Sequence, residues 1–161
     1  MKRFGVVAVA AGLIMAASPA FALDVSKSVT TNAKPAAVWQ TIGDFCGIGD
    51  WHPAVEKCEE SDADGTKRRT LTLAGGGGTL VEDLVSRDDD KMTYTYKIVE
   101  GPLPVQNYQS TISVGPNGDG STISWTGEFD AKGAPDADAE KVIAGIYDAG
   151  LNSIAEKAGA M

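Results

Sequence analysis

Apolar and polar residues alternate with a period of two along most of this chain, which is typical of strands with one buried face. Residues 24–31 show the alternation first, with Val25 and Val29 set among polar neighbours. It recurs in segments that begin at Arg69, Leu80, Met92, Tyr108 and Ile123. The Gly75–Gly78 run and Asn117-Gly118 separate such segments, and both sequences favour turns. The pattern therefore predicts a series of antiparallel strands.

Two other segments have the period of an amphipathic helix. Pro35 is typical of the first turn of a helix, and this short helix would present one apolar face made of Val38, Trp39, Ile42 and Phe45. Pro135 predicts the start of a long C-terminal helix that ends near Gly159. Its apolar face would consist of Val142, Ile143, Ile146, Tyr147, Leu151 and Ile154. Gly145 and Gly150 lie inside it, where glycine costs about 1 kcal/mol relative to alanine. We expect them to leave room beneath the helix.

The order of elements is strand, short helix, six antiparallel strands and long helix. This order predicts an α+β fold in which a curved seven-stranded antiparallel sheet wraps around the C-terminal helix. A sheet that curls around a helix leaves a space between the two.

Two opposite charges fall on the inward face of neighbouring predicted strands. If Gly76-Gly77 is a two-residue hairpin loop, Leu71 faces Glu82 and Arg69 is a diagonal neighbour of Glu82. A buried charge is costly unless it is paired, so one interpretation is a structural ion pair. The other is that Arg69 anchors a carboxylate or enolate of a ligand.

The N-terminal residues have a different character. Met1-Lys2-Arg3 is basic, Val6 to Ala17 is apolar, and the run ends in small residues at Ala20 and Ala22. This is typical of a secretory signal peptide covering residues 1–22, followed by one domain at 23–161. The alternative, an uncleaved anchor, is disfavoured because the apolar run is short for a membrane span. We expect a periplasmic protein without stable membrane insertion.

Composition excludes several classes of function. The 161 residues include 14 Lys and Arg against 22 Asp and Glu, a formal net charge of −8, which disfavours nucleic acid as a partner. One His and two Cys cannot supply a four-ligand Cys/His zinc site, and we expect neither metal nor cofactor. In an oxidising compartment, Cys46 and Cys58 are expected to form a disulfide, with two separate buried thiols as the alternative.

The element order, Val38-Trp39, Asp44-Phe45, Trp51-His52-Pro53 and the closing helix together resemble the SRPBCC superfamily. That superfamily includes START lipid-transfer domains, the birch-pollen-allergen group and polyketide cyclase/dehydrase-like proteins. The resemblance implies a helix-grip fold with a hydrophobic cavity between the sheet and the C-terminal helix. Cys46 with Cys58 and the Gly101–Val105 segment are further similar to exported MxaD-like proteins, which implies a role beside a periplasmic dehydrogenase.

The candidate ligand-binding residues are placed in one interior by strand phase or helix face, except Trp51 and His52, which we expect near the mouth of the cavity. They are Trp51, His52, Arg69, Glu82, Tyr94, Tyr96, Tyr108, Trp125, Ile146, Tyr147 and Gly150. Aromatic rings with polar tips suit a cavity for a flat or apolar ligand; any one ring alone is better explained as ordinary core, but five polar tips in one interior exceed what packing requires. The candidates for catalysis are His52, Arg69 and Glu82, with His52 alternatively a hydrogen-bonded turn residue.

Three functions therefore remain open. The favoured one is binding of an apolar or aromatic small molecule. The others are docking on a periplasmic dehydrogenase as an accessory protein, and catalysis of the cyclase/dehydratase type.

Overall fold

The computed structural model describes residues 22–160, so the predicted signal peptide lies outside the described residues except for Ala22. Seven strands run as β1 (Leu23–Thr31), β2 (Val55–Ala63), β3 (Thr66–Leu73), β4 (Thr79–Asp88), β5 (Thr93–Glu100), β6 (Val105–Asn117) and β7 (Gly120–Ala131). The helices are α1 (Pro35–Ile42), α2 (Ile48–Trp51) and α3 (Asp136–Gly159), with a 3-10 turn, η1 (Ala74–Gly76), between β3 and β4.

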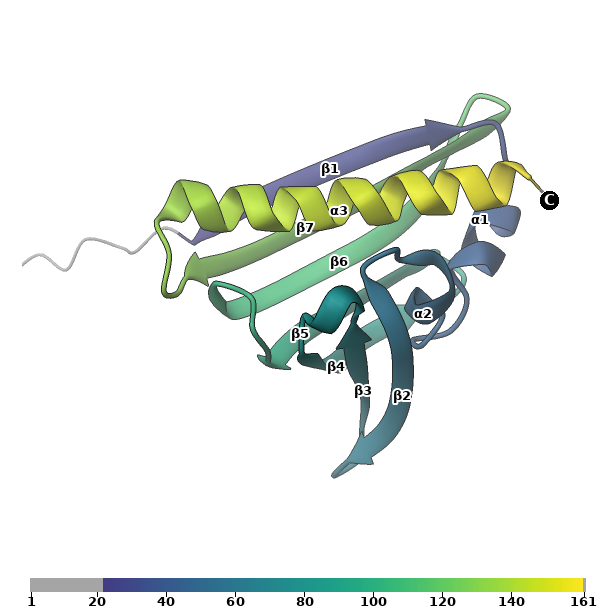
Figure 1. Ribbon diagram of the computed structural model, residues 1–161. Helices are drawn as coiled ribbons and strands as arrows, with labels where there is room; N and C mark the ends of the chain where they lie inside the picture. Colours follow the sequence, from purple (N-terminus) through teal and green to yellow (C-terminus); the bar gives the residue numbers. More distant parts are fainter. Residues whose placement is uncertain (1–21, 161) are drawn as a thin grey trace, which may run out of the picture.

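The strands form one antiparallel sheet in the order β1-β7-β6-β5-β4-β3-β2. The sheet curves around α3, which crosses one face and lies along β1 and β7 (Figure 1). This confirms the predicted helix-grip arrangement. Within the described residues, no helix is long and apolar enough to cross a membrane.

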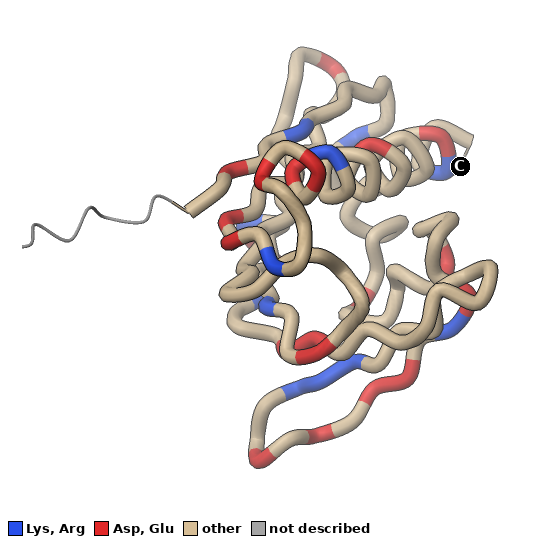
Figure 2. The backbone as a smooth tube through the Cα atoms, turned by 60° about the vertical axis from the view of Figure 1, so that its left-hand side comes forward, with Lys and Arg blue, Asp and Glu red and all other residues tan. Residues whose placement is uncertain are grey.

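Strand β2 is an edge of the sheet, and with β3 it forms a hairpin that projects from the body of the protein (Figure 1). Acidic and basic residues occur along this hairpin (Figure 2), and Glu56, Glu59 and Asp62 of β2 are exposed. Charges on an edge strand discourage pairing with the edge of another sheet.

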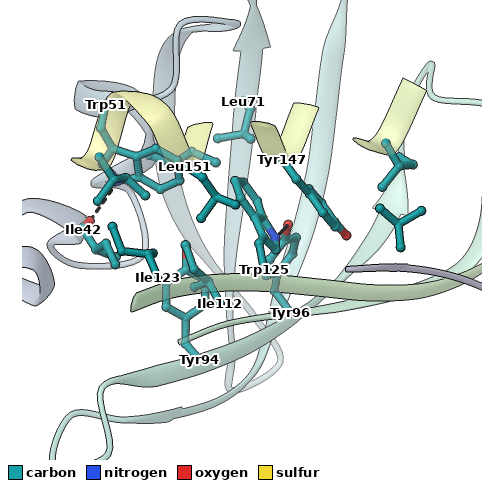
Figure 3. Packing of buried hydrophobic residues seen from close by; sticks show 14 of the residues in the cluster. Ile42, Trp51, Leu71, Tyr94, Tyr96, Ile112, Ile123, Trp125, Tyr147 and Leu151 are labelled. Atoms are coloured by element: carbon teal, nitrogen blue, oxygen red, sulfur yellow. Dashed lines mark hydrogen bonds between the residues drawn. The ribbon is translucent and has the colours of Figure 1, made fainter. Parts of the chain in front are cut away.

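The first helix is shorter than predicted. It ends at Ile42, where Gly43 takes a positive φ of 70°, so Phe45 and Cys46 follow the helix rather than belong to it. The next turn, α2, was not predicted because four residues are too few to show a period. Trp51 ends α2 and donates from Nε1 to the carbonyl of Ile42 at 3.1 Å (Figure 3).

The predicted two-residue loop between β3 and β4 is wrong. Leu71 pairs with Leu80 and Arg69 lies directly opposite Glu82, so the pairing is shifted from the predicted register. The physical reason is the glycine run: Gly75 and Gly76 take positive φ values of 67° and 74° inside η1 and form a wider turn. The shift makes Arg69 and Glu82 direct cross-strand partners instead of diagonal ones.

The predicted room beneath α3 is also absent at both glycines. Gly145 is exposed, and a Cβ there would meet no atom within 4 Å. Gly150 is buried, and a Cβ there would lie 2.7 Å from Trp125 and 2.8 Å from His52. Val142 is 40% exposed and does not belong to the buried face of the helix. Gly150 therefore allows close packing of α3 instead of leaving space.

The predicted disulfide is confirmed. Cys46, between α1 and α2, is bonded to Cys58 of β2 with their Cα atoms 5.5 Å apart. The bond ties the segment that carries α2 to the edge strand beside it. Since Trp51 and His52 follow directly, the disulfide helps to fix one wall of the interior.

Candidate functional site

A cavity of about 230 Å³ lies between the sheet and α3. Its wall is mainly apolar and consists of Ile48, His52, Ala54, Val55, Leu71, Leu73, Ala74, Gly77, Leu80, Glu82, Tyr96, Ile98, Leu103, Tyr108, Trp125, Ile143 and Ile146. The wall residues that are partly or fully exposed come from η1 and its flanks, from the segment after His52, and from Ile98, Leu103 and Ile146. The cavity therefore reaches solvent beside η1, which lies below α3 in Figure 1.

Six of the eleven predicted ligand-binding residues belong to this wall. They are His52, Glu82, Tyr96, Tyr108, Trp125 and Ile146. The other five, Trp51, Arg69, Tyr94, Tyr147 and Gly150, are buried behind or beside the wall.

His52 is held by two hydrogen bonds at the end of α2. Its Nδ1 accepts from the backbone N–H of Ala54 at 3.1 Å, so Nε2 carries the proton and donates to the carbonyl of Ile146 at 3.0 Å. The bond to α3 depends on Gly150, whose missing side chain lets the imidazole edge reach the helix backbone. Burial lowers the pKa of His52; the Ile146 bond opposes this and Arg69 adds to it.

Arg69 and Glu82 form a buried ion pair on the inner face of β3 and β4. Arg69 Nε donates to Glu82 Oε2 at 2.6 Å and Nη1 donates to the carbonyl of Phe45, whereas Nη2 has no hydrogen-bond partner among residues 22–160. The guanidinium lies over the Phe45 ring at 4.1 Å and the Tyr96 ring at 5.0 Å, which offsets part of its desolvation.

The two members of this pair differ in access to the cavity and in pKa. Glu82 belongs to the wall, whereas Arg69 lies behind it and is fully buried. Burial raises the pKa of the Glu82 carboxyl, and the guanidinium lowers it only in part. Burial acts to lower the pKa of Arg69, but the Glu82 carboxylate and the nearby tyrosines outweigh it and raise the pKa.

The aromatic polar groups are joined in one hydrogen-bonded chain. Ser110 Oγ donates to the carbonyl of Thr126 at 2.7 Å, so it accepts from Tyr147 Oη at 2.9 Å. Tyr147 in turn accepts from Tyr108 at 2.6 Å, and Tyr108 accepts from Tyr96 at 3.3 Å. These groups satisfy one another, as buried polar groups require.

Trp125 completes the chain. Its Nε1–H is shared between Tyr96 Oη at 3.1 Å and Ser110 Oγ at 2.9 Å. Its ring stacks on Tyr147 with centroids 4.6 Å apart, and Figure 3 shows the two rings side by side beneath α3. Burial raises the pKa of Tyr147 to about 12, so its hydroxyl stays neutral.

Gly127 is a site residue that the sequence reasoning missed. A Cβ at this position of β7 would overlap the Tyr147 hydroxyl, so only glycine lets that hydroxyl cross the strand to Ser110. A glycine inside a strand pattern is the available signal, because it marks a close approach of another group.

A second hollow of about 550 Å³ lies on the surface where β5 and β6 part. Polar side chains such as Lys97, Glu100 and Lys132 line it, and it shares Ile98, Leu103 and Tyr108 with the internal cavity. The internal cavity is the better candidate site because its wall is mainly apolar and its polar groups are few and fixed. Among residues 22–160, no three His, Cys, Asp or Glu side chains gather into a possible metal site.

A curved sheet that grips a helix over an apolar cavity defines a helix-grip protein of the ligand-binding type. Residues 22–159 match the family described as polyketide cyclase / dehydrase and lipid transport, and the chain belongs to this family. The predicted resemblance to the SRPBCC superfamily is thus confirmed. No curated protein matches the chain.

Solved structures agree with this assignment. The protein XoxI from Bacillus cereus is 31% identical with a TM-score of 0.77, over 83% of this chain and 94% of that one. A protein from Thermobifida fusca is 33% identical with a TM-score of 0.75, over 85% and 93% of the two chains. The Zhui aromatase/cyclase from Streptomyces sp. R1128, at 19% identity and a TM-score of 0.68 over 85% and 93%, shares the fold.

Proposed function

We propose that this protein binds a small apolar or aromatic molecule in the periplasm. The observation that carries the proposal is the mainly apolar cavity of about 230 Å³ between the sheet and α3. Apolar pockets with few, fixed polar groups are typical of small-molecule sites. Membership of a family described by lipid transport as well as cyclase activity supports binding of an apolar compound.

Binding fits the geometry better than catalysis does. General acid or base catalysis at His52 would need a ring nitrogen that can reach a substrate. Both nitrogens of His52 are committed to backbone groups, and its lowered pKa keeps the ring neutral. His52 thus acts as a clamp between the start of β2 and α3.

Export is part of the proposal and has its own support. The disulfide between Cys46 and Cys58 is compatible with an oxidising compartment. The N-terminal sequence has the basic, apolar and small-residue regions of a signal peptide.

The cavity is tested by filling it. Ile143 lines the cavity from α3, whereas its neighbour Val142 is 40% exposed on the same helix. Replacing Ile143 by Trp should weaken binding of an environment-sensitive apolar dye by about tenfold or more, which corresponds to about 1.4 kcal/mol. Val142→Trp is the matched control and should leave dye binding unchanged.

Two outcomes would contradict the proposal. One is an unmodified protein that binds no dye and carries no small molecule in native mass spectrometry of periplasmic material. The other is equal dye binding by both Trp variants, which would place the dye outside the cavity.

A further inference from the structure

The side-chain hydrogen-bond donors of the cavity wall are already engaged within the protein. His52 donates to the Ile146 carbonyl and accepts from Ala54. The Trp125 indole N–H is shared between Tyr96 and Ser110. Neither side chain has a donor left for a ligand.

The two tyrosines of the wall are committed in the same way. Because Ser110 gives its proton to Thr126, the chain of bonds runs in one direction from Tyr96 through Tyr108 to Tyr147. Each phenol therefore gives its one proton to its neighbour. The wall offers a ligand no free side-chain donor.

Glu82 differs from the other polar residues of the wall because one of its acceptor atoms is not engaged. Its Oε2 accepts from Arg69 Nε, and no donor among the described residues contacts Oε1. The residue is 3% exposed, and it belongs to the cavity wall. A charged acceptor thus stands in a wall that is otherwise apolar or already paired.

We propose that the ligand is a neutral, mainly apolar molecule of about one ring that carries an O–H or N–H group and donates it to Glu82. This inference rests on the proposed function and names the class of ligand. A dry cavity of about 150 Å³ accommodates benzene. About 230 Å³ leaves room for a ring with a small substituent.

The geometry also selects against the carboxylate ligand that the sequence suggested for Arg69. The guanidinium lies behind Glu82, between the rings of Phe45 and Tyr96, and does not reach the wall. A carboxylate in the cavity would meet the Glu82 carboxylate first, and like charges repel at short range.

Three compounds of similar shape test the inference: p-cresol, toluene and 4-methylbenzoate. Their affinities are measured by dye displacement or calorimetry on the intact protein. A hydrogen bond to a charged acceptor contributes more than one between neutral groups, so p-cresol should bind at least about tenfold more tightly than toluene. 4-Methylbenzoate should bind most weakly.

A pair of double variants places the donor contact. Arg69→Met with Glu82→Leu removes the inner pair without leaving a buried charge, and should bring p-cresol and toluene to similar affinities. Arg68→Met with Asp83→Leu removes the neighbouring pair from the same two strands, but neither residue lines the cavity. This control should keep the preference for p-cresol.

The outcomes separate this inference from the proposed function. Equal binding of toluene and p-cresol, or tightest binding of 4-methylbenzoate, by the unmodified protein overturns the inference while binding itself stands. A preference for p-cresol that survives in the inner double variant also overturns it. Failure of all three compounds to bind, together with failure of the dye, overturns the proposed function as well. The affinities of the three compounds are compared on the unmodified protein, so this part of the test does not depend on whether a variant folds.

Discussion

Two arginine–carboxylate pairs lie side by side on β3 and β4 and differ in how completely they are satisfied. Arg68 faces Asp83 and Arg69 faces Glu82, and because side chains alternate along a strand, the pairs lie on opposite faces of the sheet. The outer pair is bidentate, with Arg68 Nε to Asp83 Oδ1 at 2.6 Å and Nη2 to Oδ2 at 3.0 Å. The inner pair has only the bond between Arg69 Nε and Glu82 Oε2.

The more deeply buried pair is therefore the less complete one. Arg68 keeps about a third of its side chain in water, whereas Arg69 is fully buried and its Nη2 is unpaired within the described part of the chain. A buried ion pair with unsatisfied atoms contributes little to stability, and an apolar pair of similar size often serves as well or better. Stability alone therefore does not account for the inner pair, which agrees with a role of Glu82 in the cavity.

The largest effect should come from removing one inner charge. Glu82→Leu leaves the Arg69 guanidinium buried without its counter-ion, and we expect the free energy of unfolding to fall by about 3–5 kcal/mol. Asp83→Leu leaves Arg68 in reach of water and should cost about 1 kcal/mol or less. Urea unfolding of the disulfide-bonded protein measures both.

The inner double variant, Arg69→Met with Glu82→Leu, should recover most of that loss because no charge stays buried. If Glu82→Leu and Asp83→Leu lower the free energy of unfolding equally, the proposed difference between the two faces of the sheet is wrong. A double variant as unstable as Glu82→Leu would show that the inner pair does stabilise the fold.

The deficits of the two arginine variants should both grow with pH, but in different pH windows, because the carboxyl pKa is raised in the inner pair and lowered in the outer one. Burial raises the folded pKa of Glu82 above its ordinary 4.5, so the folded state holds the proton more tightly and stability falls as pH rises through that window. Arg69→Met removes the opposing guanidinium, so the deficit of this variant relative to the unmodified protein should grow as the pH rises above 4.5.

The outer pair should respond at lower pH. The Arg68 hydrogen bond lowers the pKa of Asp83 below its ordinary 3.8, which stabilises the fold above that pH and is lost in acid. The deficit of Arg68→Met should therefore shrink as pH falls below about 4. Urea denaturation curves at several pH values measure both deficits. If the two deficits change with pH in the same window, the assignment of the pKa shifts to Glu82 and Asp83 is wrong.

The smallest expected effect is a shift in the pKa of His52, which belongs to neither ion pair. His52 is the single histidine of the chain, so its proton NMR signal is unambiguous. Burial should place its pKa below the ordinary 6.5, and Arg69 lowers it further. Arg69→Met should move the pKa upward, whereas Arg68→Met should leave it in place. A pKa at or above 6.5 in the unmodified protein would mean that the imidazole is not buried as described.

The strand phases and the fold were predictable because alternation in a sheet decides which side chains face the helix. Tyr96, Tyr108 and Trp125 share the interior as their phase indicated. The direct pairing of Arg69 with Glu82 was not predictable, because it depends on how many glycines the intervening turn uses.

The contacts of single glycines could not be predicted from the sequence for a related reason. Gly127, Gly145 and Gly150 look alike in a pattern, yet the first accommodates a hydroxyl, the second faces solvent and the third packs against two rings. What covers a residue without a side chain is decided by the packing of distant segments. The cavity wall was therefore predicted only in part.

The position of β1 has a consequence for how the chain assembles. Within the sheet β1 pairs only with β7, so Leu23 meets Phe129 across more than a hundred residues, and α3 packs on β1 later still. Such non-local pairing requires closure of a long loop and slows folding. The N-terminal strand cannot complete its sheet until almost the whole chain is available. If the chain is exported unfolded and N-terminus first, as proposed, this delay keeps its leading end free of stable structure during passage.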